Sequence, residues 1–526
     1  MTFISLTYAL FLVSVLGIYW SLQQQKSQMW ALLIVSLVFY TSLQAPTLVK
    51  EQTWLQLLAS PQVAYVPLLL VITLINFRLG KAIGENTALG LYATDPNEDW
   101  QFDQAFWNRQ RLKLLWLGIV LNVLLLLSFK YIPFLLNSVA GFYGQLTGSP
   151  LPVAANTASW VSTNLIAPLG LSFFSFECIA YLIDVYRGAP AQERFLNFAA
   201  YKLFFPKLIA GPITRYHQFS AQLKTLQFPT LNQITEGLWL IACGAVKKAL
   251  IADRLGIFVD LCFGNLERAG SGDLWLAIAA YGLQLYLDFS GYVDIARGSA
   301  ILLGFHLPEN FDFPYFSTSI AEFWRRWHIT LGDWLRNYLY FPLGGSRQGL
   351  RRTCLNLLIV MLIAGIWHGA AWGYVVWGAI HGISLVVHRL TEDHSHRSEK
   401  ARKWWQSFPG LVVAWLLTQT MVFVSWVFFR LPNLKQSGLV IQRLWGHPAD
   451  AQFAAKVYGE AIGLDQSQLT FLLWILVALM FFVYTVHRGL KLQLNWPVKL
   501  LLVPLCLYVV WVFAPQGGLP YIYFDF

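Results

Sequence analysis

A histidine stands inside a long apolar stretch of this chain, in the run Ile366-Trp367-His368-Gly369-Ala370. Imidazole titrates near neutrality, so it can take a proton from a hydroxyl group and later return it. Lipid cannot solvate an imidazole, so a histidine within a membrane span must meet protein groups or water. His368 is therefore either a catalytic base or a structural histidine that bonds to a neighbouring helix.

A second histidine follows two arginines in the run Phe323-Trp324-Arg325-Arg326-Trp327-His328. The flanking aromatic side chains suit a helix that lies at a membrane surface. The guanidinium groups of Arg325 and Arg326 suit the phosphates of a ligand and anionic lipid headgroups equally well. The residues of this run leave both interpretations open.

Further polar groups interrupt apolar stretches elsewhere in the chain. Asp288 and Ser290 lie in one such stretch, and Lys247 and Lys248 lie in another, where they either reach toward water or contact an anionic ligand. Lys207 stands between Pro206 and Pro212, and because two prolines exclude a regular helix, a re-entrant or broken element is predicted there.

The elements that position these groups are predicted to be membrane-spanning helices. Hydrophobic residue types make up 56% of the 526 residues and charged types only 12%, whereas soluble domains carry about 25% charged residues. A bilayer core of about 30 Å needs ~20 apolar residues in a helix. The qualifying runs predict about 10 to 12 spans in an all-α polytopic membrane protein. They are Phe3–Trp20, Met29–Leu43, Val63–Phe77, Leu112–Leu136, Leu165–Ile183, Ile234–Phe263, Leu274–Phe289, Asn356–Val387, Gly410–Phe429, Thr470–Val486 and Val498–Ala514.

The formal net charge of +10 predicts a topology rather than a nucleic-acid partner, because lysine and arginine gather in cytoplasmic loops of membrane proteins. Three basic segments are expected in the cytoplasm, at residues 186–232, 306–352 and 388–403. The polar loops at residues 137–164 and 432–468 are expected outside. If the last two basic segments share one side, the run between them forms a helical hairpin or two half-spans that meet at a break. The break is expected near Gly365, Gly369 and Gly373.

Several kinds of chemistry lack their sequence signatures. The five cysteines form no C-x-x-C pair, so neither a zinc nor a redox site is expected. Signatures of serine hydrolases, zinc helices, phosphate-binding loops and dinucleotide-binding turns are also missing. Three classes remain: a group transferase embedded in the membrane, a secondary transporter of a small anionic or sugar substrate, and a scaffold subunit of an export complex.

The order of these motifs resembles the membrane-bound O-acyltransferase (MBOAT) superfamily, and within it the bacterial alginate O-acetyltransferase branch. The segments that carry the resemblance are Ser172–Asp184, Phe205–Pro212, Asp288–Tyr292, Pro308–Phe311, Phe323–His328, Tyr340–Gly345, Trp367–Gly369, His381-Gly382 and Tyr521–Phe526.

The resemblance implies one membrane-embedded domain over residues 1–526, with a helical fold and a central tunnel. Residues 1–136 would form N-terminal spans, 165–390 the catalytic core and 410–526 C-terminal spans. His368 corresponds to the family's characteristic histidine and His328 to its second catalytic position.

The resemblance also implies a bacterial inner-membrane enzyme that takes acetyl from cytoplasmic acetyl-CoA, a substrate rather than a bound cofactor. The acceptor would be an extracytoplasmic polysaccharide or a relay partner protein of the SGNH type. Donor contacts are expected from the arginine pair and its neighbour, and tunnel-lining or structural roles from four other residues. These are Arg325, Arg326 and Trp327 for the donor, and Asp288, Ser290, Trp367 and Lys207 for the tunnel.

Overall fold

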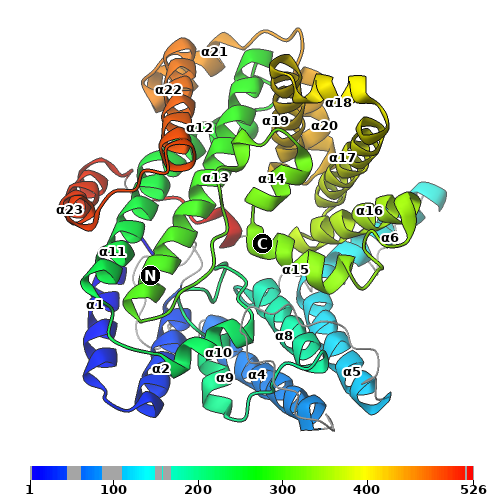
Figure 1. Ribbon diagram of the computed structural model, residues 1–526. Helices are drawn as coiled ribbons and strands as arrows, with labels where there is room; N and C mark the ends of the chain where they lie inside the picture. Colours follow the sequence, from blue (N-terminus) through cyan, green and yellow to red (C-terminus); the bar gives the residue numbers. More distant parts are fainter. Residues whose placement is uncertain are drawn as a thin grey trace. The chain divides into compact units, whose positions relative to one another are not determined.

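The computed structural model describes residues 3–43, 61–85, 109–147, 157, 167–515 and 518–524, and these residues form helices and turns (Figure 1). Within them the structure contains no β-strand, and the backbones of Phe311 and Trp327 form an isolated antiparallel bridge. The predicted all-α class is confirmed.

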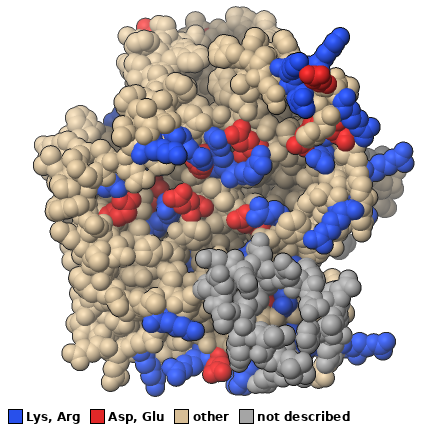
Figure 2. All heavy atoms as spheres, viewed as in Figure 1, with Lys and Arg blue, Asp and Glu red and all other residues tan. Residues whose placement is uncertain are grey.

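Six helical segments of the described chain are long and apolar enough to cross a membrane. Large apolar side chains such as Phe471, Trp474 and Trp511 are exposed on them, as expected where lipid replaces water. Most atoms on the face drawn in Figure 2 belong to residues without formal charge. The protein is thus a multi-pass membrane protein. The six segments are Val63–Gly84, Arg109–Gly144, Gly349–His368, Phe408–Arg430, Gln466–Gly489 and Trp496–Phe513.

The contacts of the described chain divide it into two compact units. The first unit comprises residues 1–241 and 295–308. Its helices are α1 (Leu6–Ser21), α2 (Gln25–Ser42), α4 (Pro61–Glu85), α5 (Arg109–Leu126), η2 (Leu127–Tyr131), α6 (Ile132–Thr147), α8 (Leu171–Tyr186), α9 (Phe195–Lys202), α10 (Tyr216–Lys224) and most of α11 (Leu231–Ala245).

The second unit comprises residues 242–294 and 309–526. Helix α13 contributes residues to both units. The elements that begin in the second unit are η3 (Val246–Ala252), α12 (Asp253–Gly264), α13 (Ser271–Leu302), η4 (Pro314–Phe316), α14 (Ile320–Arg326), α15 (Ile329–Leu335), η5 (Arg336–Tyr340), α16 (Gly349–His368), α17 (Trp372–Arg397), α18 (Glu399–Gln406), α19 (Phe408–Arg430), α20 (Leu434–Arg443), α21 (Ala451–Ala454), η6 (Ala455–Ile462), α22 (Gln466–Tyr484), η7 (Thr485–Gly489), α23 (Trp496–Phe513) and η8 (Ile522–Phe524).

A buried arginine joins three helices of the first unit. The guanidinium group of Arg111 on α5 donates hydrogen bonds to the carbonyl of Ile83 on α4, at 3.1 Å, and to that of Tyr186 at the end of α8, at 2.8 Å. Helix ends leave carbonyls without intrahelical donors, and Arg111 supplies donors to them. The arginine thereby fixes α5 against the ends of α4 and α8.

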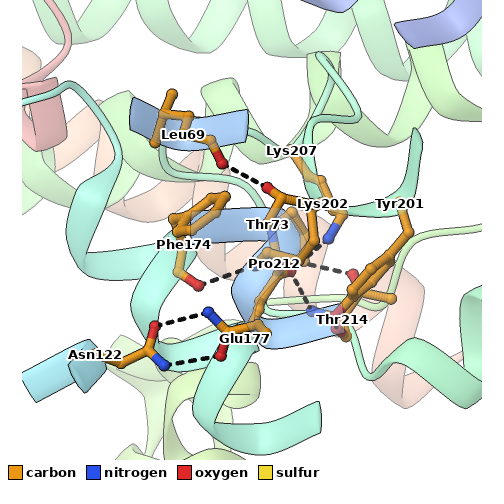
Figure 3. Close-up of polar contacts among 11 residues, drawn as sticks. Leu69, Thr73, Asn122, Phe174, Glu177, Tyr201, Lys202, Lys207, Pro212 and Thr214 are labelled. Atoms are coloured by element: carbon orange, nitrogen blue, oxygen red, sulfur yellow. Dashed lines mark hydrogen bonds and ion pairs between the residues drawn. The ribbon is translucent and has the colours of Figure 1, made fainter. Parts of the chain in front are cut away.

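The predicted broken element around Lys207 is anchored by a carboxylate of the first unit (Figure 3). Glu177 on α8 accepts from the ammonium group of Lys207 at 2.5 Å and from that of Lys202 at 3.0 Å. It also accepts from the backbone N–H of Thr214 at 3.2 Å. Helix α9 ends at Lys202, and turns and irregular backbone follow up to Pro212, so the prediction of a non-helical element is confirmed. One carboxylate holds both of its ends.

Two helices of the second unit form the predicted hairpin (Figure 1). Helix α16 ends at His368, the backbone is extended at Gly369 and Ala371, and α17 begins at Trp372. An added Cβ at Gly365 would collide with the Tyr374 carbonyl of the opposite leg. The two legs therefore pack backbone against backbone, and the break falls where the sequence predicted it.

Two predictions about the N-terminal half differ from the structure or fall outside it. The predicted start of the polar loop at residue 137 is wrong, because helix α6 continues to Thr147. Its small polar residues had suggested a loop, but the apolar side chains among them sustain a helix. The rest of that loop lies outside the described residues, except for residue 157.

The central tunnel, the single domain and the number of spans beyond six stay predictions.

Candidate active site

His368 is the last residue of α16 and lies at the tip of the hairpin. Its side chain is buried, with 3% of the residue exposed. A Cβ at position 369 would collide with the ring of Tyr374, so only glycine allows the chain to turn closely around that tyrosine. The glycine therefore lets the chain reverse immediately after the histidine.

His328 stands at a sharp turn between two short helices, α14 and α15. Its backbone adopts φ 45° and ψ 54°, in the left-handed region, which costs a non-glycine residue about 1–2 kcal/mol. Two bonds to Asn310 hold the turn: the N–H of Ile329 donates to its carbonyl at 3.0 Å, and the hydroxyl of Thr330 donates to its side-chain oxygen at 2.6 Å. These bonds fix the direction in which the imidazole points.

The two histidine rings share two aromatic neighbours. The ring of Tyr523 has its centre 6.1 Å from the centre of His328 and 6.1 Å from that of His368. The indole of Trp367 lies 4.9 Å from His368 and 6.4 Å from His328. The fold thus gathers both predicted catalytic histidines of the second unit around one pair of aromatic rings.

The surroundings of both histidines are apolar. His328 also packs on Phe289, with ring centres 4.9 Å apart, and His368 packs on Trp377 at 5.1 Å and on Phe429 at 5.0 Å. Burial lowers the pKa of His328 to about 3, because a charged imidazole loses its hydration there. His328 is therefore neutral at physiological pH and can accept a proton or a hydrogen bond.

Tyr523 belongs to the segment at residues 518–524, here called the tail. A buried ion pair of the second unit holds this tail. Asp288 accepts from the ammonium group of Lys248 at 2.6 Å and from the backbone N–H of Ile522 at 3.0 Å. Lys248 also donates to the carbonyl of Pro520 at 3.0 Å. Of the two roles proposed for Asp288, the geometry supports the structural one, since its carboxylate fixes the tail next to both histidines.

Other charged residues singled out in the sequence are paired. Lys247 donates to Asp294 at 2.6 Å, and Lys248 belongs to the ion pair with Asp288. Lys207 belongs to the first unit and contacts Glu177 there. Ser290 is buried on α13, and the described residues offer its hydroxyl no hydrogen-bond partner. These contacts place Lys207, Lys247 and Lys248 in the scaffold.

The residues expected to bind the donor lie on and just after α14 but face different surroundings. Arg325 is exposed, while Arg326 forms an ion pair with Glu322 at 2.6 Å. Trp327 is buried and packs on Phe323, with ring centres 5.6 Å apart. Arg325 is thus accessible from outside the protein, whereas Trp327 belongs to the packing beside the turn at His328. A donor-binding role for the three residues stays a prediction.

Asn310 and Tyr523 did not emerge as site residues from the sequence. Both stand in segments that carry the family resemblance, Pro308–Phe311 and Tyr521–Phe526, and that was the available signal. His381 on α17 is a third buried histidine, and its Nε2 lies 2.9 Å from the hydroxyl oxygen of Ser425. Its ring packs on Trp377, which in turn packs on His368.

The arrangement suits proton transfer at a buried centre surrounded by aromatic rings. Two imidazoles within aromatic walls can exchange a proton with a hydroxyl group, and the walls keep bulk water from a reactive acyl group. Among the described residues, no group of three or more His, Cys, Asp or Glu side chains is placed to hold a metal ion.

Comparisons with known proteins agree with this chemistry. The family model for MBOAT, the membrane-bound O-acyltransferase family, matches residues 114–428. A protein of Pseudomonas putida named "Probable alginate O-acetylase" is 37% identical over 438 residues, which cover 83% of this chain and 78% of that protein. A protein of Pseudomonas aeruginosa with the same name is 37% identical over 81% of this chain and 71% of its own length. The peptidoglycan O-acetyltransferase of Helicobacter pylori is 35% identical over 73% of this chain and 71% of its own length.

Proposed function

The chain belongs to the membrane-bound O-acyltransferase family, and we propose that it transfers acetyl from cytoplasmic acetyl-CoA to a hydroxyl group of an extracytoplasmic polysaccharide. The acetyl group reaches the polysaccharide directly or through a relay partner protein. In this proposal the enzyme works in the inner membrane of a bacterium. The names of its relatives support acetyl as the acyl group and a cell-envelope glycan as the acceptor.

His368 is the general base of the proposed reaction. Its imidazole takes the proton of the acceptor hydroxyl as the hydroxyl oxygen attacks the thioester carbonyl. The tetrahedral intermediate then collapses, the carbon–sulfur bond breaks, and the imidazolium returns the proton to the departing thiolate. The products are an acetyl ester and free CoA, so protons and charge balance.

His328 has a supporting role in the same step. Because its pKa is lowered to about 3, the ring is neutral and can hydrogen bond to the donor or to the acceptor hydroxyl without carrying a charge into the site. Trp367 and Tyr523 form the walls that hold both rings. Arg325, exposed on α14, is the candidate contact for the donor phosphates.

The observation that carries the proposal is the convergence of the two histidines on Trp367 and Tyr523. His328 and His368 lie 40 positions apart in the sequence and on different elements. A structural histidine needs only one partner helix, whereas this arrangement places two imidazoles around the same pair of rings, in apolar surroundings. Such a constellation suits catalysis of proton transfer.

The test uses purified full-length protein in lipid nanodiscs, acetyl-CoA labelled in the acetyl group, and alginate oligosaccharides or peptidoglycan-derived disaccharides as the source of the acceptor hydroxyl. We expect the wild type to release free CoA, and His368→Ala to lose this release by at least about 10²-fold while its melting temperature stays close to that of the wild type. His447→Ala, at an exposed histidine, is the matched control and should keep wild-type turnover. Wild-type turnover in His368→Ala would remove that residue from the mechanism. Passage of intact substrate across liposomes without thioester cleavage would instead identify a transporter.

A further inference from the structure

A pocket of about 320 Å³ lies within the second unit, one side chain away from His368. Phe429 forms the shared wall, since its ring lines the pocket and packs on the imidazole with ring centres 5.0 Å apart. Ile522 also lines it and directly precedes Tyr523 in the tail. The full lining is Asp260, Tyr281, Gln284, Tyr374, Phe429, Arg430, Pro432, Leu519, Pro520 and Ile522.

The pocket lies at the end of α19 that is farther from the basic segment at residues 388–403. Helix α19 starts just after that segment and runs from Phe408 to Arg430 over 23 residues, a length of about 35 Å that crosses a bilayer core. The hairpin tip lies at the same end, because the N–H of Gly373 donates to the carbonyl of Pro432 at 2.9 Å. Since basic segments face the cytoplasm, the pocket belongs to the extracytoplasmic side.

The polar groups of the pocket come from an ion pair and an amide. The guanidinium group of Arg430 donates to Asp260 at 2.6 Å, with the two side chains 35% and 47% exposed. Gln284 is buried, with 7% exposed, and the described residues offer no hydrogen-bond partner to its Oε1. A buried acceptor that lines a cavity without a protein donor is satisfied by a ligand or by water.

The position of Gln284 on α13 connects the pocket with the histidine site. Tyr281, Gln284 and Asp288 follow one another at spacings of three and four residues and therefore share one face of the helix. The first two line the pocket, and Asp288 fixes the tail beside His328 and His368. One helical face thus runs from the pocket to the candidate catalytic centre.

The chemistry of the lining matches a sugar ring. A pyranose presents hydroxyl groups that both donate and accept, beside C–H faces that pack on aromatic rings. The pocket offers a carboxylate, a guanidinium and an amide for the hydroxyl groups, and aromatic side chains for the apolar face. It offers neither a purely apolar cavity for an acyl chain nor a cluster of cations for the phosphates of a nucleotide.

We propose that this pocket binds the sugar unit that carries the acceptor hydroxyl, with Gln284, Asp260 and Arg430 contacting its hydroxyl groups. The proposal rests on the proposed acetyl transfer and adds where the acceptor binds and which residues select it. Bound there, the sugar is separated from His368 by the Phe429 ring, which must move before a hydroxyl group can reach the imidazole.

The test measures binding and turnover separately, with alginate oligosaccharides and peptidoglycan-derived disaccharides as the two acceptor probes. In wild-type protein in nanodiscs, we expect at least one probe to bind. In Gln284→Met and in Arg430→Met, the dissociation constant of that probe should rise on the order of tenfold for each lost hydrogen bond. The KM for acetyl-CoA should stay at the wild-type value.

Arg389→Met is the matched control, because Arg389 forms a similarly exposed ion pair with Glu392, also at 2.6 Å, on α17 away from the pocket. It should leave the dissociation constant of the probe unchanged. Gln284→Glu keeps the acceptor oxygen and fills nearly the same volume, so it should bind the probe more tightly than Gln284→Met if both fold.

The results separate the failure of this inference from failure of the proposed function. The inference is overturned if wild-type protein releases CoA in a His368-dependent way yet binds neither probe. It is also overturned if Gln284→Met and Arg430→Met bind the probe as the wild type does, or if Arg389→Met weakens binding equally. If CoA release does not depend on His368 in the first place, the proposed function itself is wrong.

Discussion

Asn310 and Thr330 are joined by two hydrogen bonds to one oxygen, because the side-chain oxygen of Asn310 accepts from the Thr330 amide at 3.1 Å and from its hydroxyl at 2.6 Å. Both residues are buried. The turn that they close contains His328 in its left-handed conformation. The imidazole is therefore positioned by a side chain that does not itself reach the other histidine.

Replacing Asn310 should slow catalysis by displacing His328. We expect Asn310→Ala to lower kcat for CoA release by about tenfold or more, since a displacement of 1 Å can cost up to ~10²-fold. Asn310→Asp keeps the accepting oxygen and should retain more activity than the alanine variant. An unchanged kcat in Asn310→Ala, measured on folded protein, would show that the turn holds its shape without this residue.

The close packing of the hairpin should make it intolerant of even a methyl group. At Gly365 an added Cβ would collide with the Tyr374 carbonyl, so Gly365→Ala should destabilise the protein by about 1–3 kcal/mol and lower its melting temperature in detergent. Gly438 on α20 has open space around it, and Gly438→Ala should instead keep or raise the melting temperature. Equal melting temperatures of the two variants would contradict this packing.

The buried carboxylate of Glu177 should be essential for stability in the first unit. In Glu177→Gln the ammonium groups of Lys202 and Lys207 stay buried without a counter-charge, which costs about 3–5 kcal/mol. Thermal unfolding in detergent should show the loss, and adding Lys207→Met should restore part of it. If the single and double variants unfold together at the wild-type temperature, the cluster contributes nothing to stability.

Acid should destabilise the protein partly through His328. Its pKa is about 3 in the folded protein and about 6.5 in an unfolded chain, so between these values only the unfolded state takes up the proton. This destabilisation is absent above pH 6.5. Below pH 6.5 it lowers the free energy of unfolding by about 1.4 kcal/mol for each pH unit. His328→Asn, which tolerates the left-handed backbone, should lose less melting temperature between pH 6.5 and pH 4.5 than the wild type does. A parallel loss in both proteins would contradict the low pKa.

Local patterns predicted the class of fold and the hairpin. Apolar runs of span length identified the helices, and the three glycines together with two basic segments predicted the reversal that follows His368. Such features depend on neighbouring residues, so a sequence reveals them. Likewise, the prolines around Lys207 predicted a broken element correctly.

Contacts between residues far apart in the chain could not be predicted from the sequence. Tyr523 stands 155 positions after His368, and no periodicity connects them. The partner of Asp288 is Lys248 on another element, which helical spacing could not indicate. Trp327 packs on Phe323 and Phe311, and no pattern in the sequence indicates these contacts. Residue type and resemblance singled out His328 and His368 as candidates, whereas only the fold identifies the aromatic side chains around them.

The ring of Phe429 alone lies between His368 and the neighbouring pocket. His368 belongs to the hairpin, whereas the opposite side of the Phe429 ring is lined by residues of α12, α13 and α19, by Leu519, Pro520 and Ile522, and by Tyr374 of the hairpin itself. Residues of those helices can be exchanged without altering the backbone that carries the imidazole. If the pocket binds the acceptor as proposed, substitutions in α12 and α13 would give such an enzyme a new glycan preference and leave the backbone around His368 unchanged.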